Sequence, residues 1–269
     1  MFFFTPNASH NISYSMSKID YVLVFDSGVG GLTTLSALKK TCPKANFLYL
    51  SDDKNCPYGN KSPDDLTHII SAVIKTAMKT HKLSAVVIAC NTATTSVIGS
   101  IRSQFAIPII GTEPNLKEPD LLGFHHITLM ATPLTLSQSR TKFLEQNSKA
   151  KVHHVNGGNL AGLIENYILT QDSKTKLKIH KIIKSKLKYT PKFHAITLGC
   201  THYVFFKQYI ETTLKFRCFD GNLGVANRLK NVLNEIGYKG KESKLKFISS
   251  SLPHTLRLKQ AFKRLTAVK

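Results

Sequence analysis

Short apolar runs rich in β-branched residues alternate with longer stretches of helical periodicity along almost the whole chain. This alternation is typical of βαβ units, in which helices connect parallel strands and cover the sheet. We therefore expect an α/β fold built on mostly parallel sheets flanked by helices. The pattern predicts strands near residues 21–26, 46–51, 84–89, 107–111, 126–131, 151–155, 193–198, 216–219 and 245–248.

An internal repeat indicates two similar lobes. The segment from Lys82 to Thr92 matches the segment from Lys192 to His202 at an offset of 110 residues. Each copy holds a basic residue, an apolar strand, a small residue, a cysteine and two polar residues. A weaker match at an offset of 106 residues pairs the strand ending at Asp26 with the strand ending at Thr132. We expect lobes related by a pseudo-twofold axis, with an active site between them.

The apolar runs are too short for a membrane protein. The longest have about six to eight residues, whereas a helix needs roughly 20 to cross a bilayer. The start of the chain lacks the basic region of a secretory signal. We therefore predict a cytoplasmic protein without a membrane partner. A second methionine, Met16, precedes the first predicted strand, so residues 1–16 are expected to form a disordered leader.

The formal net charge of +21 raises the question of nucleic-acid binding. Only six of the 37 basic residues are arginine, the residue that binds phosphates and bases with a bidentate fork. The lysines are scattered, and the densest cluster, residues 174–192, alternates with apolar residues at helical spacing. A solvated helix face is the favoured interpretation, and nucleic acid is an unlikely partner.

The five cysteines are Cys42, Cys56, Cys90, Cys200 and Cys218, an odd set without paired spacing. This pattern argues against a disulfide framework and against a zinc site. Cys90 and Cys200 follow the two repeated strands, and parallel α/β sheets bind ligands at the carboxyl ends of strands. Two facing lobes would direct both thiols into one cleft, although a coincidence of two buried cysteines is the alternative.

Two opposed thiols suit the inversion of a carbon that bears hydrogen. One group must remove a proton from one face while another delivers a proton to the opposite face. The ordinary cysteine pKa, about 8.5, keeps thiol and thiolate accessible near neutral pH. The repeat therefore favours a proton-transfer reaction.

Five segments, in this order, resemble the glutamate racemases of the aspartate/glutamate racemase superfamily. They are Phe25-Asp26-Ser27-Gly28-Val29-Gly30-Gly31-Leu32-Thr33, Asp52 through Cys56-Pro57-Tyr58-Gly59-Asn60-Lys61-Ser62, Ala89-Cys90-Asn91-Thr92-Ala93-Thr94, Ala131-Thr132 with Thr135, and Leu198-Gly199-Cys200-Thr201-His202-Tyr203. The resemblance extends from about residue 20 to 205. It implies interconversion of L- and D-glutamate without pyridoxal phosphate or a metal.

The resemblance also implies catalytic roles. Cys90 would remove the α-proton of D-glutamate and Cys200 that of L-glutamate. Asp26 would assist Cys90, and His202, together with Glu165, would assist Cys200. The proline and cysteine that usually precede the family's acidic residue are absent before Glu165.

The same resemblance implies the substrate-binding residues, several of which have a structural alternative. The residues implied are Asp26, Ser27, Pro57, Tyr58, Gly59, Asn91, Thr92, Thr132, Thr135, Thr201 and His202. Residues 57–59 would bind the side-chain carboxylate, or form an ordinary turn. Thr132 and Thr135 would line the site, or begin a helix. The loop at residues 27–31 would hold an anion on its N–H groups, or form a tight turn. Asn55 and Val204 replace an arginine and a proline of the family.

The sequence also predicts where the chain crosses between the two lobes and what the protein does in the cell. The proline-rich segment 111–119 predicts one crossing between lobes. The family pattern implies a return near residues 221–224, hence a first lobe of residues 17–113 plus 225–269 and a second of residues 114–224. It also implies a role in peptidoglycan synthesis, and leaves open a homodimer and an effect on DNA gyrase. The alternatives are a racemase of aspartate or another amino acid, and a nucleic-acid-binding protein on a degenerate scaffold.

Overall fold

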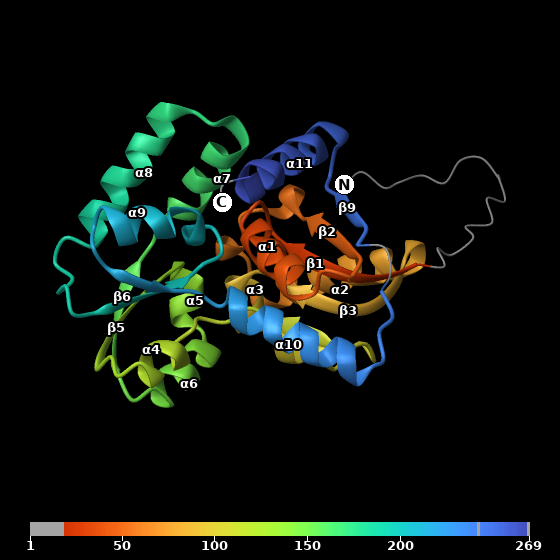
Figure 1. Cartoon of the computed structure of the whole chain (residues 1–269), viewed down its shortest axis with the longest axis horizontal. Coiled ribbons are helices and arrows are strands. Elements are labelled where there is room, and N and C mark those ends of the chain that lie inside the picture. Colours follow the sequence, from red (N-terminus) through yellow and green to blue (C-terminus); the bar gives the residue numbers. More distant parts are fainter. Residues whose placement is uncertain (1–18, 241–242, 268–269) are drawn as a thin grey trace.

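The computed structural model describes residues 19–240 and 243–267, and the predicted leader lies outside this part. The described residues form two separate sheets, one on each side of the molecule (Figure 1). The first sheet has the order β4-β3-β1-β2-β9, with β1 (Asp20–Asp26), β2 (Phe47–Ser51), β3 (Lys82–Ile88), β4 (Ile109–Gly111) and β9 (Leu245–Ile248). The second has the order β6-β5-β7-β8, with β5 (His126–Ala131), β6 (Lys151–Asn156), β7 (Ala195–Gly199) and β8 (Arg217–Phe219).

The strand predictions are confirmed at all nine positions, and every strand pair is parallel. The order β2-β1-β3-β4 in the first sheet corresponds to β6-β5-β7-β8 in the second. The repeat therefore matches β3 to β7 and β1 to β5, and β9 is an additional edge strand. The expected α/β fold with two similar lobes is confirmed.

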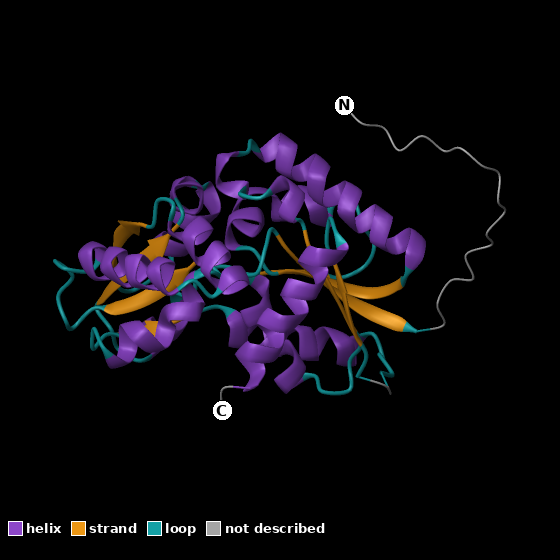
Figure 2. Ribbon diagram, turned by 90° about the horizontal axis from the view of Figure 1, so that it is seen from above, coloured by secondary structure: helices purple, strands orange, loops and turns teal. Residues whose placement is uncertain are grey.

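Helices cover both faces of each sheet (Figure 2). Those beside the first sheet are α1 (Gly31–Thr41), α2 (Pro63–Thr80), α3 (Asn91–Arg102), α10 (Asn222–Glu235) and α11 (Leu252–Ala267). Those of the second lobe are α4 (Lys117–Leu121), α5 (Pro133–Ser137), α6 (Ser139–Gln146), α7 (Leu160–Thr170), α8 (Ser173–Lys186) and α9 (Lys207–Thr212). Short 3-10 turns are η1 (Asp53–Asn55), η2 (Tyr58–Asn60) and η3 (Tyr203–Phe206).

The lysine-rich segment 174–192 is helical only as far as Lys186, where α8 ends. Ile179 and Ile183 are buried, while the lysines of α8 before Lys186 are exposed. This arrangement is the amphipathic, solvated helix expected from the spacing.

Apolar side chains on both faces of the first sheet fix the position of its strand ends. Leu66, Ile70 and Ile74 of α2 are fully buried against one face, while Leu32 and Leu35 of α1 pack on the other. A parallel sheet covered on both faces has a dry core, so polar groups reach solvent or each other mainly at the strand ends. This architecture concentrates polar chemistry at the carboxyl edge.

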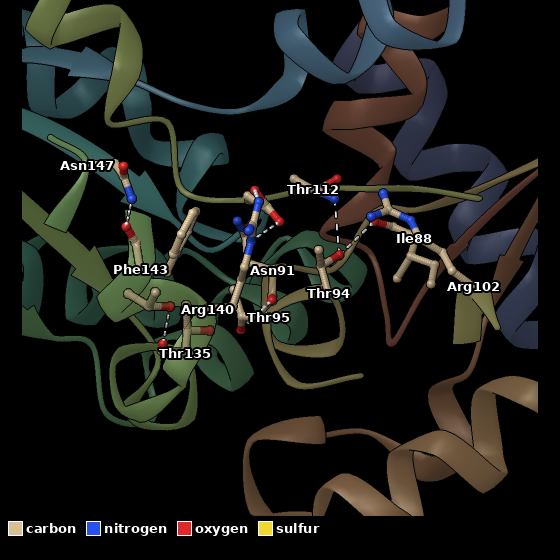
Figure 3. Close-up of polar contacts among 12 residues, drawn as sticks. Ile88, Asn91, Thr94, Thr95, Arg102, Thr112, Thr135, Arg140, Phe143 and Asn147 are labelled. Atoms are coloured by element: carbon tan, nitrogen blue, oxygen red, sulfur yellow. Dashed lines mark hydrogen bonds and ion pairs between the residues drawn. The ribbon is translucent and has the colours of Figure 1, made fainter. Parts of the chain in front are cut away.

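Two crossings between the lobes run side by side. Asn115 donates a hydrogen bond from Nδ2 to the carbonyl oxygen of Asp220, at 3.0 Å. The amide of Thr112 donates to Oγ1 of Thr94, at 3.1 Å (Figure 3). A Cβ atom on Gly221 would lie 2.7 Å from the carbonyl oxygen of Glu113, so only glycine allows this approach. We propose that these two segments, which lie in contact with each other, are the connections between the lobes.

No helix within residues 19–240 and 243–267 is long and apolar enough to span a membrane.

Burial predicts a contrast between two positions of α2. Ile70→Ala removes a fully buried side chain and should lower the free energy of unfolding by about 2–5 kcal/mol. Met78→Ala, at a position that is 38% exposed, should change it by less than about 1 kcal/mol. Urea denaturation measures both values, and equal losses would show that α2 does not pack as described.

Candidate active site

The carboxyl ends of four strands meet between the lobes. Asp26 is the last residue of β1, and Cys90 caps the start of α3 just after β3. Cys200 follows β7, and Thr132 follows β5. In each sheet these two strands are neighbours at the point where the strand order reverses, which is where open α/β sheets bind ligands. The structure therefore brings both cysteines to the predicted kind of position.

Asp26 is fully buried and receives hydrogen bonds from both lobes. The amide of Gly28 donates to Oδ1 at 2.8 Å, and the hydroxyl of Thr201 donates to Oδ2 at 3.2 Å. Burial raises the pKa of Asp26 to about 7, while the positive charge of His202 opposes that rise. Near neutral pH this carboxyl group can both accept and release a proton.

Cys90 is buried beside Asp26 and Ser27. Burial and the negative charge of Asp26 raise the pKa of Cys90 well above its ordinary value, although the Ala93 amide and the Ser27 hydroxyl stabilise the thiolate. The charge of Cys200 acts in the same direction as that of Asp26. Without substrate, Cys90 is therefore held as the thiol.

Cys200 belongs to a chain of three polar groups. Its Sγ atom lies 3.8 Å from Nδ1 of His202, whose Nε2 lies 2.7 Å from Oε2 of Glu165. Burial opposes protonation of His202, but the hydrogen bonds to Cys200 and Glu165 outweigh it and raise the pKa of His202 well above its ordinary value. Instead of starting a regular α helix, His202 precedes the 3-10 turn η3.

The glycine loop of the first lobe packs tightly against this chain. The Val29 amide donates to Oε2 of Glu165 at 2.7 Å. A Cβ atom on Gly28 would lie 2.3 Å from the same oxygen, and one on Gly30 would lie 2.4 Å from Oγ1 of Thr201. The loop opens α1 as predicted, but the anions bound by the Gly28 and Val29 amides are carboxylates of the protein itself.

Three threonine hydroxyls from the two lobes contact one another. Oγ1 of Thr92 lies 3.0 Å from that of Thr132 and 3.2 Å from that of Thr135. Thr132 also caps α5 by accepting a hydrogen bond from the Thr135 amide, at 3.2 Å. Thr132 and Thr135 thus begin a helix, and their hydroxyls lie together with that of Thr92; their place in a substrate site stays a prediction.

Asn91 offers a donor in this region that lacks a partner within the described residues. Its Nδ2 group is buried, and no hydrogen bond satisfies it. The hydroxyl of Thr95 donates to the carbonyl oxygen of Asn91 at 2.9 Å, which anchors the first turn of α3 (Figure 3). A buried donor without a partner is costly, so a ligand carboxylate at this position would be stabilising.

The segment Pro57-Tyr58-Gly59 forms a turn whose tyrosine points inward. Tyr58 is buried, packs on Phe25 with ring centroids 6.1 Å apart, and donates from its hydroxyl to Oδ2 of Asp52 at 2.6 Å. Pro57 is exposed and Gly59 half-exposed. The segment is thus a turn, and only Tyr58 is held within the protein.

Three further residues help to build the site. The hydroxyl of Tyr49 donates to the carbonyl oxygen of Gly28 at 2.6 Å and holds the glycine loop. Asp52 directly follows β2, much as Asp26 ends β1. Its position after a predicted strand could have identified it as a candidate site residue from the sequence. Burial, together with the negative charge of Glu165, raises the pKa of the neighbouring Cys56 to about 12, so Cys56 stays a thiol at neutral pH.

The raised pKa of Asp26 predicts a stability cost near neutral pH. Folded Asp26 binds its proton up to about pH 7, whereas the unfolded carboxyl releases it near 3.8. Stability therefore falls as pH rises through this window. Asp26→Asn lacks this penalty and can still accept from Gly28, so it should gain on the order of 2–4 kcal/mol at pH 8 and nothing below about pH 4. Denaturant unfolding at both pH values tests this, and a gain independent of pH would contradict it.

The Glu165–His202 pair also makes the fold less stable as pH rises, but here the protonated form is the one that the folded protein stabilises. A raised histidine pKa stabilises the fold fully below the unfolded value of about 6.5, and the contribution disappears as pH rises through the folded pKa. Glu165→Gln should therefore lower stability most in acid, and should lower the His202 pKa measured by NMR. The control is Glu145→Gln, because its partner His154 is 42% exposed on its side chain and the pair contributes little.

Comparisons with known proteins agree with this geometry. Residues 32–229 match the family model described as Asp/Glu/Hydantoin racemase. The chain is 35% identical to a glutamate racemase of Clostridium acetobutylicum over 84% of this chain and 90% of that one. It is 32% identical to a glutamate racemase of Vibrio campbellii, over 86% and 87% of the two chains. The structure of Escherichia coli glutamate racemase with L-glutamate and the activator UDP-MurNAc-Ala is similar, with a TM-score of 0.79, 25% identity and coverage of 91% and 95%. The chain thus belongs to the Asp/Glu/Hydantoin racemase family, and the two curated relatives named above are glutamate racemases.

Proposed function

We propose that this protein interconverts L- and D-glutamate without a cofactor, by proton transfer between the substrate and two cysteines. The observation that carries the proposal is the pair of buried thiols, Cys90 and Cys200, at equivalent ends of the repeated strands β3 and β7. Each thiol has its own proton-accepting neighbour, Asp26 or His202. Such a pair can serve both faces of one carbon atom.

The reaction needs one thiolate and one thiol at a time. In one direction the thiolate of Cys200 removes the α-proton of L-glutamate, and the thiol of Cys90 delivers a proton to the opposite face. In the reverse direction Cys90 removes the proton of D-glutamate and Cys200 delivers one. The carbanion between these steps is stabilised by the substrate's own carboxylate, so donors around that carboxylate favour the transition state.

The two half-sites prepare their thiols differently. Asp26, with a pKa of about 7, can take the proton of Cys90 when substrate binds. His202, held by Glu165, can carry the proton of Cys200. A general base contributes most when its pKa lies near the working pH, which Asp26 satisfies.

Polar groups at the helix starts suit the substrate carboxylates. The Nδ2 group of Asn91 and the hydroxyls of Thr92, Thr132 and Thr135 would bind the α-carboxylate, with Thr201 beside them. Ser27 would line the same space, and the turn at residues 57–59 would bind the side-chain carboxylate. We also propose that the protein is cytoplasmic, that it supplies D-glutamate for peptidoglycan synthesis and that it forms a homodimer.

Serine replacements test the two thiols, because a hydroxyl has the right size but too high a pKa. Cys90→Ser and Cys200→Ser should each lower kcat for racemisation by about 10²–10⁴-fold, the usual loss for a missing general base. Circular dichroism of glutamate, without added cofactor, follows the reaction. Cys42→Ala, a cysteine after α1, is the matched control and should keep its activity.

Hydrogen exchange separates the two roles. In heavy water, the Cys90→Ser variant should exchange the α-hydrogen of L-glutamate only, and the Cys200→Ser variant that of D-glutamate only. Racemisation surviving in both variants would disprove the mechanism. Turnover of aspartate in preference to glutamate would instead point to the sister racemases.

A further inference from the structure

Three histidines form a cluster in the second lobe, away from the cysteines. They are His126, the first residue of β5, His153 in β6 and His194 just before β7. One ring nitrogen from each lies within 4.8 Å of the others, and no other such group of three potential ligands occurs in the described part of the chain. None of the catalytic roles above uses these residues.

The strand register places all three imidazoles on one face of the sheet. Thr128 pairs with His153 of β6 and with Ile196 of β7. Residues two apart on a strand share a face, so His126 lies on the face of Thr128, and His194 on that of Ile196. The cluster is therefore a product of the parallel pairing of three strands.

The distance between two of the rings suits a shared metal ion, whereas the ligand atoms of all three spread over up to 4.8 Å, so one ring would shift to reach the same ion. Nδ1 of His126 and Nε2 of His153 lie 3.2 Å apart. Two nitrogens bound to zinc at about 2.0–2.1 Å in a tetrahedron lie about 3.3–3.4 Å apart. The third imidazole is also oriented, because Nδ1 of His194 lies 2.9 Å from the hydroxyl of Thr128. Polar partners of this kind orient metal-bound imidazoles.

The exposure of the three histidines agrees with a metal site. Neutral imidazole is the form that binds metals. His194 is buried, while His126 and His153 are half-exposed and leave a path for an ion and for solvent.

We propose that His126, His153 and His194 bind a divalent metal ion of the zinc type, with solvent as the fourth ligand. Imidazole favours zinc, copper, nickel and cobalt over magnesium and calcium. The ion would cross-link β5, β6 and β7 at their amino ends. Because β5 has six residues, this edge lies roughly 20 Å from the strand ends at the cleft. The site is thus separate from the proposed racemase site and does not depend on it.

The test is a titration of the full-length, chelator-treated protein with Co²⁺, followed by competition with Zn²⁺. We expect one equivalent to give visible d–d bands of a tetrahedral nitrogen and oxygen site, without the near-ultraviolet charge-transfer band of a thiolate ligand. His126→Ala and His153→Ala should each weaken binding by at least about tenfold. His154→Ala is the matched control, because His154 follows His153 on the same strand and pairs with Glu145 at 2.6 Å.

Two further measurements test whether the thiols bind the metal and whether the histidine variants fold. Binding should persist in the Cys90→Ser/Cys200→Ser double variant, because the thiols are not ligands. Far-ultraviolet circular dichroism of the metal-free variants should match that of the wild type, and His153→Gln provides a second replacement at a half-exposed position. The proposal is overturned if Co²⁺ does not bind, if a thiolate band dominates, or if the histidine variants bind as tightly as the control.

Discussion

The site depends on two carboxylates that are held by donors from both sides of the cleft. Asp26 binds the Gly28 amide and the Thr201 hydroxyl, while Glu165 binds the Val29 amide and His202. A buried carboxylate is stable only when such donors surround it. Separating the lobes would remove Thr201 from Asp26 and Val29 from Glu165. The same bonds that position the proton-transfer groups therefore also hold the two sheets together.

The two repeated segments supply half-sites of opposite electrostatic character. The offset of 106 residues matches Asp26 to Thr132, and the offset of 110 matches Thr92 to His202. One lobe thus supplies a carboxylate and the other an imidazole, each beside its own cysteine. Burial raises the pKa of Asp26, whereas hydrogen bonding raises that of His202. The two thiols thus have different neighbours, and the ionised form of Asp26 opposes folding near neutral pH.

Sequence patterns predicted the strands and their alternation with helices, because these depend on local periodicity. All nine strands were located, because buried parallel strands are short apolar runs between helical segments. The repeat also indicated that Cys90 and Cys200 occupy equivalent strand ends. Contacts made by the packing of one lobe on another have no such local signal. The sequence places Tyr49 in a strand but does not show that its hydroxyl holds the glycine loop. The amides of that loop bind Asp26 and Glu165, whereas the sequence predicted that they would hold an external anion. The histidine cluster was missed because its members are 27 and 41 residues apart and meet only through strand register.

The two edges of the second sheet can act independently. Its carboxyl edge faces the cleft through Thr132 and Cys200, and its amino edge carries the histidine cluster. A divalent ion roughly 20 Å from a unit charge in a water-like medium contributes only about 0.4 kcal/mol, and salt with a Debye length of about 8 Å screens most of that. A metal at the histidines would therefore have little electrostatic effect on the far edge of the sheet. It would instead stabilise the pairing of β5, β6 and β7 in proportion to its binding.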